Sequence, residues 1–152
     1  RYNGSNYISA TPLHVISSLD FSREWNTYEY PLGGNYYGYY DIAIGNIDGV
    51  AGNEIVAAYD WLYDLNLNIV DGVTRTLKST TKKDLEPALS IALADFGGSG
   101  INSIVGTSQN QLHIIDGSSL NILWSSIVLA GTSASASIDT ADLSGDGVPD
   151  LI

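Results

Sequence analysis

The chain has 152 residues, the length of about one domain, and its 17 acidic against six basic side chains give a net charge of −11. This balance excludes a nucleic-acid partner, because phosphates require a basic face, and it argues against insertion at an anionic membrane surface. There is no cysteine and hence no disulfide framework, and no apolar run approaches the ~20 residues that span a bilayer. Because the chain begins at Arg1 and contains no Met, we expect a processed product or a part of a longer polypeptide.

The first predicted element is a strand at residues 13–16, rich in β-branched side chains, and a second strand leads on to Trp25. Equivalent blocks recur at residues 67–70 and 112–115, each followed by an Asp-Gly pair that predicts a hairpin turn. Trp124 stands at the same place after its block as Trp25 does. We therefore expect both tryptophans to pack between repeated units.

A strand, a polar loop and a second strand make up the other recurring block. Its loop begins at Asn46, Asp95 and Asp142, with spacings of 49 and 47 residues. The two blocks together define a unit of four short antiparallel strands and about 50 residues, and no stretch has a useful helical period. We predict one all-β domain over residues 1–152, with partial repeats at about 1–40 and 136–152 and full repeats at about 41–89 and 90–135.

Four-stranded units of this length are typical of β-propeller blades, and a closed propeller usually has about four to eight of them. About three repeats do not close a ring, so we expect an incomplete ring. Two interpretations stay open: the chain is a segment of a larger propeller with further blades, or identical subunits assemble to complete one. Two such chains would supply about six blades.

The third loop, residues 142–150, carries the donor set of a calcium site. Oxygen-bearing side chains stand at loop positions 1, 3, 5 and 9, namely Asp142, Ser144, Asp146 and Asp150. Gly147 allows the sharp turn that wraps such a loop around an ion, and the carbonyl of Val148 is available at the next position. An EF-hand would add a bidentate Glu and flanking helices, whereas this loop leads into a strand. We predict a structural Ca²⁺ site here, with a plain Asp/Gly turn as the alternative.

The pattern Asp142-x-Ser144-x-Asp146-Gly147-x-x-Asp150, followed by Leu-Ile, resembles the FG-GAP/VCBS repeat. This repeat is the blade unit of the integrin α-subunit propeller and of many bacterial and archaeal surface proteins. The run Asp95-Phe96-Gly97-Gly98 is similar to the Phe-Gly element behind the family's name, and the resemblance covers almost the whole chain in three copies. It implies Ca²⁺ at the outer edge of a blade, and a ring used for adhesion, for ligand display or as the accessory domain of an enzyme.

When the family pattern is carried over residue by residue, only the third loop is complete. The first copy keeps Asn46, Asp48 and Glu54 but has Val and Ala at positions 5 and 6, and whether it binds metal stays open. The second keeps Asp95 with only serines beyond it, and we expect an empty turn there. The reason is that the number of charged ligands controls the affinity of such loops.

Residues that are not repeated are the candidates for ligand contact. Trp61 lies in a predicted loop at residues 59–64, where it could stack on a sugar, anchor a protein or simply cap the blade edge. Four tyrosines before the first loop, which suit recognition or a subunit interface, are Tyr36, Tyr37, Tyr39 and Tyr40. His14 and His113 share one repeat position, which indicates a scaffold role for both rather than catalysis.

We therefore expect a calcium-stabilised propeller segment, extracellular or at the cell surface, that serves adhesion, ligand binding or surface assembly with a protein or carbohydrate ligand. The sequence contains no Gly-rich phosphate loop, no Ser/His/Asp constellation and no Cys/His metal cluster, so we predict no catalytic residues. Two alternatives stay open. One is a part of a propeller enzyme such as a calcium-dependent polysaccharide lyase, and the other is a structural subunit of a surface layer or filament.

Overall fold

The computed structural model describes residues 14–20, 22–26, 39–61, 64–82, 90–108, 111–127 and 137–152. All regular secondary structure in these segments is β, so the predicted all-β class is confirmed. No helix in the described part of the chain is long and apolar enough to cross a membrane. The strands are β1 (His14–Ile16), β2 (Arg23–Asn26), β3 (Tyr39–Gly45), β4 (Glu54–Trp61), β5 (Asp64–Asp71), β6 (Leu77–Lys82), β7 (Ile91–Ala94), β8 (Ser103–Ser108), β9 (Gln111–Ile115), β10 (Ile122–Ser125), β11 (Thr140–Ala141) and β12 (Asp150–Leu151).

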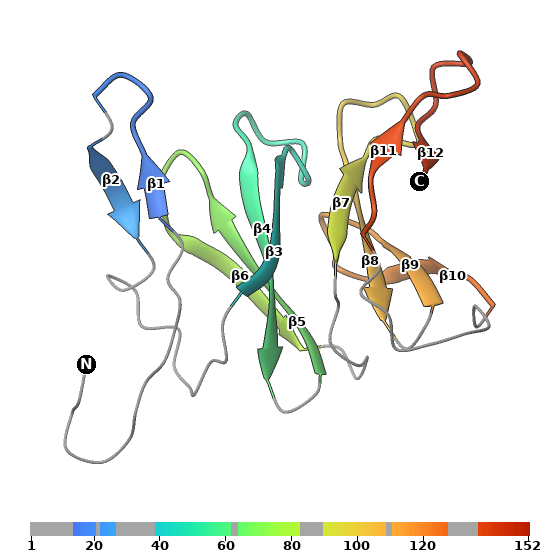
Figure 1. The fold of residues 1–152 in the computed structure, drawn as a ribbon, viewed down its shortest axis with the longest axis horizontal. Coiled ribbons are helices and arrows are strands. Elements are labelled where there is room, and N and C mark those ends of the chain that lie inside the picture. The colour runs from blue at the N-terminus through green and yellow to red at the C-terminus, as the bar shows by residue number, and fades with distance from the viewer. Residues whose placement is uncertain are drawn as a thin grey trace.

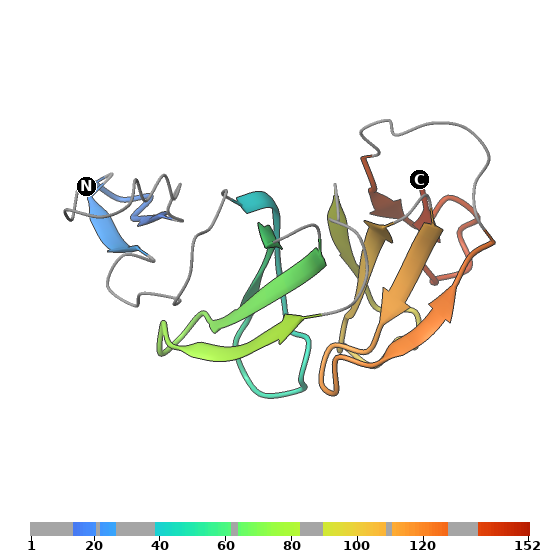
Figure 2. The ribbon, with the colours of Figure 1, turned by 90° about the horizontal axis from the view of Figure 1, so that it is seen from below.

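Two four-stranded antiparallel sheets form the body of the protein. Their strand orders are β3-β4-β5-β6 and β7-β8-β9-β10, so each sheet is a simple meander in chain order. Two smaller antiparallel sheets, β1-β2 and β11-β12, flank them. Figures 1 and 2 show the four sheets in a row, from β1-β2 to β11-β12. The described residues do not close into a ring.

Residues 59–61 and 64 of one predicted loop belong to strands in the structure. β4 continues through Trp61, which pairs with Asp64 at the start of β5, so Tyr59 and Trp61 belong to a strand and not to a loop. The prediction was wrong because it ended the strands at the apolar blocks. The β4–β5 register instead runs from Glu54 opposite Asp71 out to this pair, and polar residues take part in it.

The main core lies between the two large sheets. β4 and β5 contribute Val56, Ala58, Leu67 and Ile69, and the second sheet contributes Ile91, Ile104 and Ile115. Both central strands of the first sheet are buried on their two faces. In β4 this burial matches the apolar run at residues 55–59, whereas β5 alternates apolar residues with asparagine and buries Asn68 as well. A second core joins the β7–β10 sheet to the β11 region through Ala92, Ala94, Val105 and Ile138.

Polar side chains link the first strands of successive units in the same way. The Asp41 carboxylate accepts the N–H of Ile91 at 2.9 Å and the hydroxyl of Ser90 at 2.8 Å. The Ser90 hydroxyl oxygen in turn accepts the N–H of Ile138 at 3.2 Å. Asp41 and Ser90 occupy aligned positions of the predicted repeats, as do Ile91 and Ile138. An equivalent hydrogen bond therefore connects β3 to β7 and β7 to the segment that leads into β11.

Candidate metal centre

The third loop is organised by the carboxylate of Asp142. Its Oδ1 accepts the N–H groups of Gly145 at 2.6 Å and Asp146 at 3.2 Å, and its Oδ2 accepts the N–H of Gly147 at 2.9 Å. These bonds, that from Gly147 foremost, hold the pKa of Asp142 below its usual value, which favours the charged form at neutral pH. Gly147 has φ of 87°, a left-handed conformation that side chains with a Cβ rarely adopt.

The far end of the same loop is closed by Asp150, the first residue of β12. Its Oδ2 accepts the N–H groups of Leu143 at 2.9 Å and Ser144 at 3.1 Å, while Asp146 Oδ1 accepts the N–H of Val148 at 2.8 Å. Pro149 and Asp150 are partly buried, and residues 142–148 of the loop are exposed. The loop is therefore a hydrogen-bonded turn whose carboxylates and amides already satisfy one another.

The donors of this turn fit calcium in chemistry, although the structure does not bring them together. In the segments that the structure describes, no group of three or more His, Cys, Asp or Glu side chains converges to hold a metal ion. Every donor at positions 1, 3, 5, 7 and 9 of the loop is nevertheless a hard oxygen, which is what Ca²⁺ prefers. A carboxylate also has about four acceptor sites, so accepting amide N–H groups does not prevent an Asp from binding an ion as well.

The second loop keeps the same turn with fewer charges. Asp95 accepts the N–H of Ser99 at 3.1 Å and that of Gly100 at 2.6 Å, as Asp142 does at the aligned positions. The N–H of Gly100 is the foremost cause of the lowered pKa of Asp95. Ser99 takes the place of Asp146, because its Oγ accepts the N–H of Ile101 at 3.2 Å. The loop shape therefore does not require the carboxylates that a metal would need.

The first loop shares two bonds with the third, one accepted by Glu54 and one accepted by Asn46. Glu54 Oε2 accepts the N–H of Ile47 at 3.1 Å, as Asp150 does with the aligned Leu143. Asn46 Oδ1 accepts the N–H of Gly49 at 2.8 Å, and Asp48 Oδ1 accepts that of Val50 at 2.9 Å. In the first loop too, side-chain oxygens accept backbone N–H groups both within the loop and at its end.

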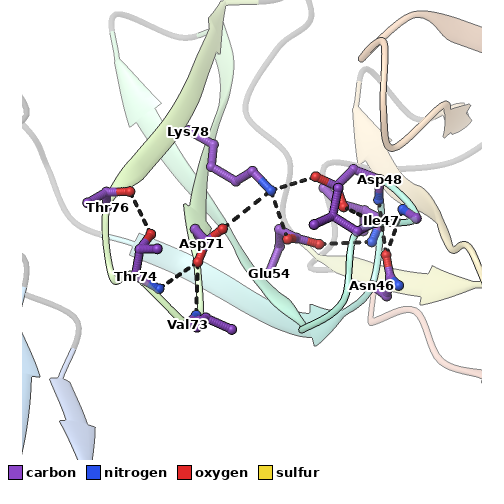
Figure 3. Close-up of polar contacts among 11 residues, drawn as sticks. Asn46, Ile47, Asp48, Glu54, Asp71, Val73, Thr74, Thr76 and Lys78 are labelled. Atoms are coloured by element: carbon purple, nitrogen blue, oxygen red, sulfur yellow. Dashed lines mark hydrogen bonds and ion pairs between the residues drawn. The ribbon is translucent and has the colours of Figure 1, made fainter.

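Lys78, a residue that the sequence interpretation did not single out, completes this first loop (Figure 3). Its Nζ lies 2.5 Å from Asp48 Oδ2, 3.1 Å from Glu54 Oε1 and 3.5 Å from Asp71 Oδ2. The hydrogen bond to Asp48 is the main cause of a raised pKa for Lys78, and the same bond lowers the pKa of Asp48. The sequence does show a lysine on the strand after the 71–72 hairpin. It does not show which carboxylates the lysine contacts, because Asp48 and Glu54 are distant from it in sequence.

The structure separates the aromatic candidates for ligand contact. Tyr39 packs inward, with its ring 6.1 Å from that of Tyr59 in an edge-to-face arrangement and its hydroxyl oxygen accepting the amide N–H of Asn68 at 3.3 Å. Tyr40 lies on the opposite, exposed face of β3, since side chains alternate along a strand. Tyr36 and Tyr37 lie outside the described residues, and of Trp61 only the backbone is described.

The two repeated tryptophans differ. Trp25 is buried, as expected, whereas Trp124 is 49% exposed on β10, the edge strand of its sheet. Trp124 therefore does not pack between two sheets of the described part. His113 is buried with its Nδ1 2.8 Å from Ser125 Oγ, which suits a scaffold role.

No family model matches this sequence, and no curated protein matches it significantly. The resemblance to the FG-GAP/VCBS repeat therefore stays a prediction from the sequence pattern.

Proposed function

We propose that the chain is a calcium-stabilised segment of a β-propeller that acts outside the cytoplasm in adhesion, ligand binding or surface assembly. The observation that carries the proposal is the third loop, where Asp142, Asp146 and Asp150 lie on one exposed turn between two strands. An acidic turn of this kind suits compartments where Ca²⁺ reaches about 1 mM, the range in which extracellular modules bind.

The arrangement of the sheets supports propeller blades. Each large sheet is a four-stranded meander, adjacent sheets bury apolar faces against each other, and the same polar link joins their first strands. Blades of a propeller require this kind of stepwise face-to-face packing. The outer turns between first and second strands then carry the candidate metal ligands.

Calcium would act as a structural clasp in the third loop. Asp142, Ser144, Asp146, the carbonyl of Val148 and Asp150 would hold it, and the bound charge would offset the mutual repulsion of the three carboxylates. An affinity near 0.1 mM and ~1–2 mM free Ca²⁺ would stabilise the fold by about 1.5 kcal/mol. The role in this proposal is to hold the loop that precedes β12.

Calcium should therefore raise the unfolding temperature, and the increase should depend on Asp142. For a chain of this size, about 1.5 kcal/mol corresponds to a midpoint roughly 4 °C higher in ~1–2 mM Ca²⁺ than in chelator. Asp142→Asn should remove this difference, because the loop loses a charged ligand. Differential scanning calorimetry of each protein, with Ca²⁺ and with chelator, measures the effect.

Asp95→Asn is the matched control for this experiment. Asp95 organises the second loop through the same amide contacts but has no further carboxylate at the aligned positions, so its variant should keep the calcium response. An unfolding midpoint of the unmodified protein that is the same with Ca²⁺ and with chelator would contradict the calcium assignment.

The exposed face of β3 supports assembly with another repeat. Ile42 and Ile44 are 48% and 62% exposed, yet the aligned residues of β7, Ile91 and Leu93, pack against the neighbouring sheet. A further repeat would cover Ile42 and Ile44 in the same way. In the described residues, the β1-β2 pair aligns with third and fourth strands and the β11-β12 pair with first and second strands, so the two pairs are complementary halves of one repeat.

We therefore expect the 152-residue chain to associate with a second copy, with β11-β12 of one copy beside β1-β2 of the other. Ile44→Asp should weaken this association by at least about tenfold, because a charge would be buried in an apolar contact. Sedimentation over a range of concentrations measures it. Ile127→Asp is the control, because Ile127 is also an exposed apolar residue and follows the edge strand β10. A chain that stays monomeric at all concentrations would rule out this mode of assembly.

A further inference from the structure

We propose that Lys78 is the built-in cation of the first loop: its ammonium binds the carboxylates of Asp48 and Glu54 in place of a metal ion. Residues 46–54 would then keep their shape without calcium. This inference concerns a different loop from the proposed calcium clasp and does not depend on it.

Burial makes a positive partner necessary at this place. The side chain of Glu54 is 3% exposed, and its Oε2 already accepts the N–H of Ile47. A carboxylate removed from water needs a compensating charge, and Lys78 supplies it at 3.1 Å from Oε1. The ammonium itself is partly solvated, since the Lys78 side chain is 29% exposed.

The ammonium of Lys78 makes hydrogen bonds to two carboxylates and an ion pair with a third. A lysine has three N–H donors, and Nζ of Lys78 faces three carboxylates from different segments. Asp48 comes from the loop interior, Glu54 from the start of β4, and Asp71 from the end of β5, where it pairs in register with Glu54. A divalent ion at Asp48 and Glu54 would have to displace this ammonium and would be repelled by it while it stays.

The second repeat provides an internal comparison. Ser79 pairs with Ile69 in the first large sheet, and Trp124 pairs with the aligned Ile114 in the second. Ser79 and Trp124 are therefore equivalent, and the residue before each gives the counterpart of Lys78, which is Leu123. The loop of that repeat has Gly97 and Ser103 where the first loop has Asp48 and Glu54. Leu123 is exposed and the loop beside it carries no charge to neutralise at those two positions. The lysine and the two loop carboxylates thus occur together in one repeat and are absent together from the other, while Asp71 keeps its aligned counterpart Asp116.

Removing the ammonium should loosen the first loop. Lys78→Met keeps an unbranched side chain but leaves Glu54 buried without its cation, so the unfolding midpoint in chelator should fall by roughly 5 °C or more. Arg75→Met is the matched control, because Arg75 pairs with Glu24 in an exposed salt bridge and should change the midpoint by less than about 2 °C. Equal midpoints for the two variants would overturn the proposal.

A second measurement tests the proposal even if Lys78→Met does not fold. Calorimetric titration with Ca²⁺ should give the same stoichiometry for the unmodified protein and for Asp48→Asn, because in this proposal the first loop holds the ammonium and no metal. A loss of bound Ca²⁺ in Asp48→Asn would overturn the proposal. The same titration of Asp142→Asn reports on the third loop, so a failure of the calcium clasp is recognised separately.

Discussion

Gly117→Ala should destabilise the protein by about 3 kcal/mol, because a methyl group at this position has no space. Gly117 lies in the β9–β10 turn, and a Cβ added there would stand 2.4 Å from the carbonyl oxygen of Ile47 and 2.6 Å from that of Asn102. Both neighbours are backbone atoms of the first and second loops, and these loops are themselves linked, since Asn102 donates its N–H to the Asn46 carbonyl at 2.8 Å. To make room for the methyl group, the backbone of the first and second loops would have to shift, and their contact with each other would be disturbed.

Urea denaturation of Gly117→Ala and Gly97→Ala tests this expectation with a matched pair. A Cβ at Gly97 would find its nearest neighbours at 3.9 and 4.0 Å, which is ordinary contact, so that variant should change the stability by less than about 1 kcal/mol. If the two variants had the same midpoint, the close approach of the β9–β10 turn to the first loop would be wrong.

Leu67→Ala should cost about 3 kcal/mol or more, since Leu67 is fully buried in the core between the two large sheets. The loss combines the transfer free energy of the removed methyl groups with the cavity that they leave. Because the residue packs against side chains of the second sheet, the variant should lower the stability of both sheets together. Urea denaturation followed by tryptophan fluorescence and by far-ultraviolet circular dichroism measures the effect.

Leu19→Ala is the control for the core variant, because Leu19 is almost fully exposed and should change the stability by less than about 0.5 kcal/mol. Two separate transitions in Leu67→Ala would indicate that the sheets unfold independently, and they would contradict a shared core.

Much of the strand pattern could be predicted from the sequence. Apolar blocks at residues 67–70 and 112–115 lie within β5 and β9, and the loops that begin at Asn46 and Asp95 each connect a first strand to a second strand. These features depend on side chains near in sequence, where alternation and turn residues are informative. The extension of β4 to Trp61 was missed because tertiary pairing with β5, and not local composition, decides where that strand ends.

The charged residues that surround the loops were harder to predict from the sequence. Asp48 and Glu54 could be recognised as oxygen donors, but the ammonium that faces them comes from a strand 24 or more residues further on. The sequence alone also could not assign Asp41, whose carboxylate bonds to a residue 50 positions away. Such contacts depend on how sheets pack, which a search for periodicity does not address.

The links at Asp41 and Ser90 have a consequence for the order in which the protein comes apart. The first junction uses a carboxylate acceptor and the second a neutral hydroxyl, and bonds to a charged group are roughly twice as strong. Arrays held together by contacts between neighbours lose their weakest junction first. Heating or mechanical pulling should therefore release β11 and β12 before it separates the two large sheets, so that the proposed calcium loop lies beyond the weaker of these two junctions.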